Sequence, residues 1–141
     1  MNLLVTGGAG FVGANFTRWW NEQRPADRLV VLDALTYAGN RANLNGVEHV
    51  FVEADIGDLQ SVESALRDFA IDVVVNFAAE SHNSYAIANP GAFFRTNVLG
   101  TQTLCEAARR TGVGRLHHVS TCEVYGDLAL DATDAFTEES P

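Results

Sequence analysis

The first thirteen residues form a short apolar run that ends in three spaced glycines, Gly7, Gly10 and Gly13. Residues 3–6 are mostly branched and apolar, which predicts a strand buried on both faces. A helix is expected to begin directly after the glycines, because apolar side chains recur at helical spacing from Phe11 onward. This arrangement leaves backbone N–H groups available to an anion, and only glycine lets a diphosphate come so close.

Composition limits the fold and the partners. A chain of 141 residues with 47% hydrophobic and 19% charged residues is typical of one globular domain. Its formal net charge of −9 argues against nucleic acid as a partner. We expect no membrane span and no signal peptide, because neither a long apolar run nor a basic leader occurs. Cys105 and Cys122 form no spaced pair or metal-ligand pattern, so we expect no metal site and a reducing, cytoplasmic location.

Strand-like and helix-like segments alternate along the rest of the chain. Besides the first strand we expect strands at 29–32, 49–53, 71–77 and 116–120. A helix should begin after Asp58, the predicted N-cap, and a long helix should run from Pro90 to about Arg110. This alternation predicts an α/β fold with a doubly wound parallel sheet in the strand order 3-2-1-4-5. The side chains assigned to the buried side of the long helix are Phe93, Phe94, Val98, Leu104 and Ala108.

Ligands of such a sheet bind at the carboxyl ends of the strands, where the strand order reverses. Asp33 lies 20 residues beyond Gly13 at such an end, where its carboxylate can accept hydrogen bonds from both ribose hydroxyls of an adenosine. It would repel a 2′-phosphate, which favours NAD over NADP; the alternative is that Asp33 only opens a turn. Asp55 is either a contact of the adenine amino group or a turn residue. Ala78 and Ala79 are small enough to let a nicotinamide ribose lie against the backbone.

Polar residues follow the fourth and fifth strands. Glu80, Ser81 and His82 would lie beside the nicotinamide ribose, although His82 is equally explained as a loop histidine with a local hydrogen bond. Residues 121–123 follow the fifth strand. Six acidic residues and no basic residue occupy the last 19 positions, which predicts a solvated loop.

Several short motifs together resemble one family, the extended short-chain dehydrogenases that act on nucleotide sugars, and within it the dTDP-glucose 4,6-dehydratases. The glycine motif is shared by the whole superfamily, whereas the Tyr-Ala-Gly-Asn, Ala-Ala-Glu-Ser-His and Glu-Val-Tyr-Gly motifs together are specific to the dehydratases. They extend over the whole chain. The residues that carry the resemblance are 6–13, 35–40, 77–82, 96–98, 120–121 and 123–126.

The resemblance implies a Rossmann fold, NAD as cofactor and a nucleotide-sugar substrate, dTDP-glucose. In this family NAD⁺ takes a hydride from C4 of the glucose, water is eliminated across C5 and C6, and the hydride returns to C6. Thr121 would hydrogen-bond the C4 oxygen and Glu123 would remove the C5 proton, while Ser81, His82 and Thr96 would help to hold substrate and cofactor. Together, the strand ends and the resemblance assign cofactor binding to Gly7, Gly10, Phe11, Val12, Gly13, Asp33, Leu35, Thr36, Asp55, Ile56, Phe77, Ala78, Ala79, Ser81 and Thr96, and substrate binding to Ser81, His82 and Thr121.

The chain departs from the family pattern in three ways. Cys122 stands where the family has the aspartate that protonates the departing hydroxyl, so we expect impaired elimination if the thiol replaces that acid; the alternative is a small packed residue without a chemical task. Asn83, Ser84 and Tyr85 replace a common Val-Asp-Arg. The chain has no lysine, so the tyrosine–lysine pair that serves the C4 hydroxyl is not within it.

These departures indicate the cofactor-binding part of a longer enzyme, ending before the usual C-terminal sugar-binding domain. We therefore expect dehydration by the full-length enzyme, and NAD binding without turnover by this chain alone. The alternatives are a dinucleotide-binding half-domain and a nucleotide-sugar epimerase; Glu123 argues against the epimerase, which needs no base at C5. The family also pairs through helices on one flank, which predicts a homodimer. The exposed faces of the helices near 58–69 and 93–110 do not by themselves establish it, and Trp19 or Trp20 on the first helix is an alternative interface residue.

Overall fold

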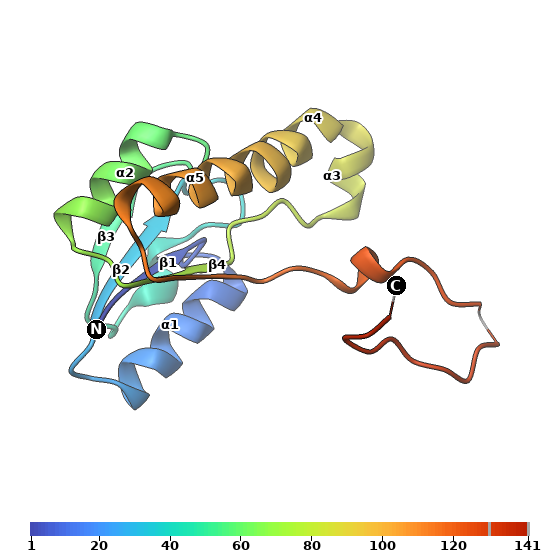
Figure 1. The fold of residues 1–141 in the computed structure, drawn as a ribbon, viewed down its shortest axis with the longest axis horizontal. Helices are drawn as coiled ribbons and strands as arrows, with labels where there is room; N and C mark the ends of the chain where they lie inside the picture. The colour runs from blue at the N-terminus through green and yellow to red at the C-terminus, as the bar shows by residue number, and fades with distance from the viewer. Residues whose placement is uncertain (130, 141) are drawn as a thin grey trace.

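The computed structural model describes residues 1–129 and 131–140, and its centre is a five-stranded parallel sheet in the order β3-β2-β1-β4-β5 (Figure 1). The predicted fold class and strand order are confirmed. Strands β1, β2 and β4 are largely apolar and buried, as expected when both faces of a parallel sheet are covered, whereas the edge strand β5 is polar and mostly exposed. The strands are β1 (Asn2–Thr6), β2 (Arg28–Asp33), β3 (Val50–Glu53), β4 (Val73–Asn76) and β5 (Arg115–His118).

Helices lie on both faces of the sheet. Helix α1 (Phe11–Gln23) covers one face, while α2 (Leu59–Asp68) and α5 (Thr101–Thr111) lie side by side on the other (Figure 1). The other helical segments are η1 (Arg41–Leu44), α3 (Asn83–Ala88), α4 (Pro90–Phe93), the π-helical η2 (Phe94–Gly100) and η3 (Cys122–Tyr125).

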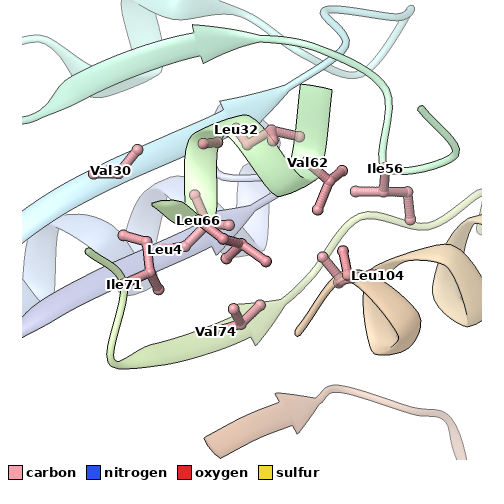
Figure 2. Packing of buried hydrophobic residues seen from close by; sticks show 11 residues of the cluster. Leu4, Val30, Leu32, Ile56, Val62, Leu66, Ile71, Val74 and Leu104 are labelled. Atoms are coloured by element: carbon pink, nitrogen blue, oxygen red, sulfur yellow. The ribbon is translucent and has the colours of Figure 1, made fainter. Parts of the chain in front are cut away.

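The main hydrophobic core lies between the sheet and the α2–α5 pair (Figure 2). Leu4 of β1 and Val74 of β4 are fully buried there against Val62 of α2 and Leu104 of α5. Helix α2 begins as predicted, because the Asp58 carboxylate accepts hydrogen bonds from the backbone N–H groups of residues 60 and 61 at 3.1 and 3.2 Å. This packing fixes the carboxyl ends of the strands relative to one another.

The buried side predicted for the long helix is partly wrong. Helical structure does run from Pro90 to Thr111, and Leu104 and Ala108 are buried. Phe94 and Val98, however, are 66% and 54% exposed. Residues 94–100 form a π-helix, which has more residues per turn than an α-helix. Apolar side chains spaced for a 3.6-residue turn therefore do not stay on the inner face.

After β5 the chain leaves the sheet as an extended, exposed segment that contains, near its start, the short 3₁₀ turn η3 (Figure 1). Over the described residues this agrees with the predicted solvated loop. No helix within residues 1–129 and 131–140 is long and apolar enough to cross a membrane.

Candidate functional site

The glycine turn after β1 is held so tightly that side chains do not fit. Gly7 has a φ of +68°, and a Cβ on it would lie 2.6 Å from the backbone nitrogen of Ala78. A Cβ on Gly13 would lie 2.3 Å from the carbonyl oxygen of Gly7. Among the described residues, no side chain caps helix α1 at Gly10. The positive end of the helix therefore faces a cradle that an anionic ligand can occupy.

Asp33 ends β2 beside this turn, and the residue is only 8% exposed. One oxygen accepts the backbone N–H of Ala9 at 2.9 Å, and the other accepts that of Leu35 at 2.8 Å. Leu35 has a φ of +50°, and a Cβ on Gly39 would lie 2.7 Å from the nearer carboxylate oxygen. The loop thus folds over Asp33, while each oxygen keeps a lone pair for a ligand hydroxyl.

A crevice of about 600 Å³, open to solvent, lies at the carboxyl ends of β1, β2 and β4. This is the place where a doubly wound sheet binds its ligand. The residues predicted for cofactor binding that line it are Gly7, Gly10, Asp33, Thr36, Asp55, Ile56, Phe77, Ala78, Ala79 and Thr96. Asp55 also accepts the N–H of Gly57 at 2.7 Å, so it is a turn residue and a lining residue at once.

The other predicted cofactor residues lie elsewhere. Phe11 is 83% exposed outside the crevice, Gly13 is buried beneath the turn, and Leu35 supports Asp33 through its backbone. Val12 and Ser81 line a neighbouring crevice. Glu80, expected beside the nicotinamide ribose, also lines this crevice. Lining residues that the sequence does not assign to the cofactor are Leu32, Ala34, Ala38, Gly39 and Ala54. Ala34 and Ala54 could have been found as small residues directly after a strand end.

The second crevice, also open to solvent, shares residues 77–80 with the first, so the two lie on either side of a common wall. It brings Ser81, Thr121 and Glu123 together, as predicted for the substrate side. Helix α3, unforeseen from the sequence, contributes Ala86 to its lining. His82 and Cys122 are exposed and lie outside the lining.

Thr121 is the N-cap of η3, and its hydroxyl donates a hydrogen bond to the Glu123 carboxylate. The Glu123 backbone N–H approaches the same hydroxyl oxygen at 3.4 Å. The turn therefore directs a hydroxyl and a carboxylate into one crevice, where they can bind a sugar hydroxyl and accept a proton.

Two asparagines hold the crevice walls in place, and sequence reasoning assigned neither to the site. Asn76 is fully buried at the end of β4, accepts the Thr6 hydroxyl, and contacts Nδ1 of His118 at 2.9 Å. Asn97 of η2 accepts the Glu80 backbone N–H and donates to the Glu80 carbonyl oxygen, both at 2.8 Å. The second pair of bonds fixes the common wall of the two crevices to the π-helical segment.

With this geometry in place, we compared the chain with known proteins. A sequence model described as the NAD dependent epimerase/dehydratase family matches residues 3–141. The chain belongs to this family. The glycine turn and Asp33 thus lie in a member of an NAD-dependent family, and their chemistry fits a dinucleotide whose diphosphate lies on the turn and whose ribose lies on the carboxylate.

Relatives within the family agree with the resemblance seen in the sequence. A dTDP-glucose 4,6-dehydratase of Mycobacterium tuberculosis is 53% identical over the whole chain, which covers 42% of that protein. The crystal structure of DesIV, a dTDP-glucose 4,6-dehydratase from Streptomyces venezuelae with NAD bound, superposes with a TM-score of 0.90 at 49% identity; the match covers all of this chain and 45% of DesIV. A Thermus thermophilus UDP-glucose 4-epimerase in complex with NAD gives 0.88 at 34% identity, covering all of this chain and 44% of the epimerase. The chain therefore spans less than half the length of these relatives.

Proposed function

We propose that this chain binds NAD in the first crevice and that Asp33 selects it over NADP. The Asp33 carboxylate carries this proposal, because two backbone N–H groups hold it at the strand end beside the glycine turn. A carboxylate in that position accepts two ribose hydroxyls and repels a 2′-phosphate. Gly10 would leave room for the diphosphate, while Gly7 and Gly13 allow the turn to pack tightly beneath it. Thr36, Asp55, Ile56 and Thr96 would line the remainder of the cofactor site.

We further propose that the longer protein dehydrates a nucleotide-activated hexose, dTDP-glucose, to its 4-keto-6-deoxy product. Bound NAD⁺ would accept the hydride that leaves C4 of the sugar and would return it to C6. Thr121 would hydrogen-bond the C4 oxygen and Glu123 would take the C5 proton, since both line the crevice that shares a wall with the cofactor crevice. Ser81 would bind the substrate from that wall.

The roles of Cys122 and His82 differ from those of their neighbours in this proposal. Both are exposed and outside the two crevice linings. The position of Cys122 favours the alternative in which its thiol has no chemical task, so that the proton for the departing hydroxyl comes from another group. His82 would act on the substrate only indirectly, as part of the segment that follows the common wall.

For this chain alone, NAD binding without turnover is the second candidate function. It is favoured by the absence of lysine from all 141 residues, because the family supplies the base for the C4 hydroxyl as a tyrosine with a lysine four residues later. We propose a cytoplasmic location, because both cysteines have free, exposed thiols and the cytoplasm keeps thiols reduced. We also propose that two copies of the chain form a homodimer.

Isothermal titration calorimetry tests the cofactor proposal. The chain should bind NAD⁺ with measurable heat, and NADP⁺ should bind at least tenfold more weakly because its phosphate meets the Asp33 carboxylate. Asp33→Asn should weaken NAD⁺ binding and narrow that difference, whereas Asp134→Asn in the exposed tail should change neither. Absence of both heat and a thermal shift with NAD⁺ would overturn the proposal.

The dehydration proposal is tested in the longer protein. Incubation with dTDP-glucose should yield the 4-keto-6-deoxy sugar nucleotide, and deuterium placed on C4 should appear on C6. Glu123→Gln should slow product formation by about 10²–10⁴-fold, the usual contribution of a general base. Cys122→Asp should raise the rate if an acid is needed at that position; an unchanged rate would place the acid elsewhere. Deuterium that stays on C4 in an altered sugar would instead favour an epimerase-like reaction.

A further inference from the structure

The cofactor crevice has two walls that come from loops far apart in the sequence. One wall is the loop after β2, which contributes Thr36, Ala38 and Gly39 to the lining. The other is the segment after β4, which contributes residues 78–80. A dinucleotide in the crevice would lie between these two loops, so a contact that joins the loops restrains the separation of the walls that hold it.

Two tyrosines join these loops. The rings of Tyr37 and Tyr85 meet edge to face, with centroids 5.0 Å apart and an interplanar angle of 83°. Tyr85 also packs on His82, with ring centroids 4.8 Å apart. Tyr37 and Tyr85 are 57% and 49% exposed and do not line the crevice, although their neighbours Thr36 and Glu80 do. The ring pair therefore joins the two loops on the solvent side of the crevice.

The β4 side of this contact is firmly anchored. Asn97 holds the backbone of Glu80 through two hydrogen bonds of 2.8 Å. The pKa of the Tyr37 phenol is raised, first because the phenol loses part of its solvation and then because of the neighbouring Glu80 carboxylate. The wall that precedes Tyr85 is thus held in place by Asn97.

We propose that Tyr37 and Tyr85 form an aromatic clasp across the mouth of the cofactor crevice and slow the release of the bound dinucleotide, an inference that rests on the NAD site proposed above. Tyr37 belongs to the Tyr-Ala-Gly-Asn motif, whereas Tyr85 is one of the three residues that replace the common Val-Asp-Arg, so one ring of the clasp departs from the family pattern. The clasp acts by holding the two walls together. Neither ring is required to touch the ligand.

The release rate of NADH measures the clasp directly. Trp19 and Trp20, the only tryptophans in the chain, allow energy transfer to bound NADH to be followed by stopped flow while excess NAD⁺ displaces it. Tyr85→Leu and Tyr37→Leu should each raise the dissociation rate about threefold to tenfold, the factor that corresponds to losing one aromatic pair. Tyr85→Phe keeps the ring and should release NADH at the rate of the unaltered chain.

Three further measurements distinguish the ring contact from a general loosening of the fold. The double variant Tyr37→Leu/Tyr85→Leu should be no faster than either single variant, because both remove the same contact. Phe136→Leu removes one ring of the tail pair Tyr125–Phe136 and should leave the rate unchanged. Circular dichroism of each variant confirms that it is folded, which is expected because both tyrosines are about half exposed.

The outcomes also separate the clasp from the cofactor proposal. If the unaltered chain binds no NADH, the proposed cofactor site fails and the clasp fails with it. If NADH binds and Tyr85→Leu releases it at the unaltered rate, the clasp alone is overturned. Release that is as fast in Tyr85→Phe as in Tyr85→Leu would assign the effect to the hydroxyl and would likewise overturn an aromatic clasp.

Discussion

Gly13 illustrates how single residues determine the shape of the cofactor crevice. A Cβ at this position would lie 2.3 Å from the Gly7 carbonyl oxygen, a backbone atom that cannot move aside without displacing the turn. Gly13→Ala should therefore lower the free energy of unfolding by about 1–3 kcal/mol, despite the better helix propensity of alanine. Urea denaturation followed by circular dichroism measures the change.

Gly114→Ala is the matched control for this substitution. Its Cβ would meet the Asp72 carbonyl oxygen at 3.5 Å, an ordinary van der Waals distance, so the urea midpoint should stay close to that of the unaltered chain. If Gly13→Ala were as stable as Gly114→Ala, the close approach between helix α1 and the turn would not constrain the fold as argued.

Single residues of the candidate site differ in how well the sequence predicts them. Gly7 and Asp33 are predictable because each stands at a fixed offset from a strand end, where backbone sterics and ligand geometry demand its residue type. Asn97 and Tyr85 are not, because their partners Glu80 and Tyr37 lie 17 and 48 residues away and the contacts exist only after folding. The position of Cys122 outside the crevice is likewise a product of the η3 turn.

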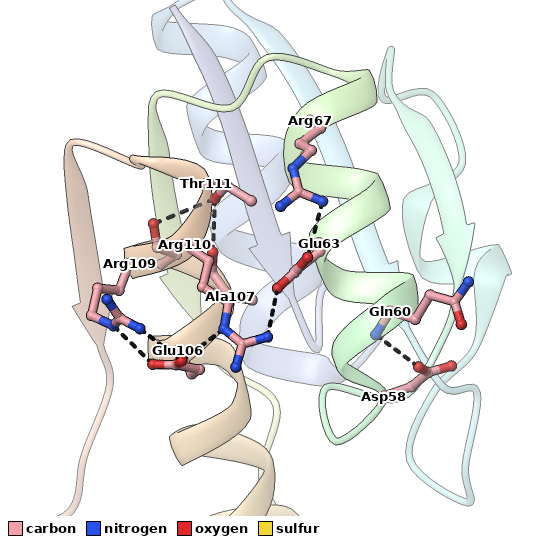
Figure 3. A network of polar contacts seen from close by, with 10 residues as sticks. Asp58, Gln60, Glu63, Arg67, Glu106, Ala107, Arg109, Arg110 and Thr111 are labelled. Atoms are coloured by element: carbon pink, nitrogen blue, oxygen red, sulfur yellow. Dashed lines mark hydrogen bonds and ion pairs between the residues drawn. The ribbon is translucent and has the colours of Figure 1, made fainter.

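Helices α2 and α5 are joined at their surface by a chain of ion pairs (Figure 3). Glu106 accepts from Arg109 at 2.8 Å and from Arg110 at 2.7 Å, and Arg110 reaches Glu63 of α2 at 3.4 Å. Glu63 is bound in turn by Arg67 at 2.9 Å. The two helices that cover the main core thus also share a charged network on their outer side, where each pair contributes little by itself.

The lowered pKa of Glu106 predicts how the stabilisation from this network depends on pH. The hydrogen bonds of Arg109 and then Arg110 lower the pKa of Glu106 from 4.5 to about 2. A carboxyl whose pKa falls on folding stabilises the folded state above its unfolded pKa, and this contribution is lost as the pH falls towards the folded pKa. Glu106→Gln should therefore be less stable than the unaltered chain at pH 7, and the difference should shrink between about pH 4.5 and pH 2.

Urea midpoints measured at several pH values between 7 and about 2 test this expectation. Glu139→Gln, in the acidic tail, provides a control in which a carboxylate is removed away from the two helices. A stability difference for Glu106→Gln that stayed constant across the whole range would contradict the role of its carboxylate. High salt at pH 7 should also reduce the difference, because exposed ion pairs are screened.

Elements were predictable where hydrophobic periodicity was clear. Strands β1 to β4 follow from apolar runs and helix α2 follows from the Asp58 cap, all of which local sequence specifies. The buried face of the long helix was not predictable, because the π-helical winding of residues 94–100 changes the angular spacing of the side chains on which the prediction relied. Helix α3 was missed because it follows a polar loop and lacks a periodic apolar stripe.

At the scale of the whole molecule, the π-helical segment leaves apolar side chains in solvent. Phe94, Val98 and Leu99 are 66%, 54% and 58% exposed. All three belong to the π-helical segment η2, which continues directly into α5 (Figure 1). Adjacent exposed apolar side chains of this size are typical of surfaces that bind another protein surface. The apolar spacing in the sequence assigns Phe94 and Val98 to the core. A helix face that binds a partner and a helix face that packs on the sheet therefore have the same apolar pattern in the sequence.

A second copy of the chain is the partner that we predict for this surface, in agreement with the homodimer expected from the sequence. Sedimentation equilibrium should give a mass near twice the 15.2 kDa of one chain at micromolar concentration. Leu99→Glu should raise the dissociation constant at least tenfold, because it places an unpaired charge in the buried contact. Trp19→Glu alters an equally exposed residue of α1, on the opposite face of the sheet, and should leave the dimer unchanged. A monomer at all concentrations, or dissociation by Trp19→Glu instead of Leu99→Glu, would contradict an interface formed by the π-helical segment.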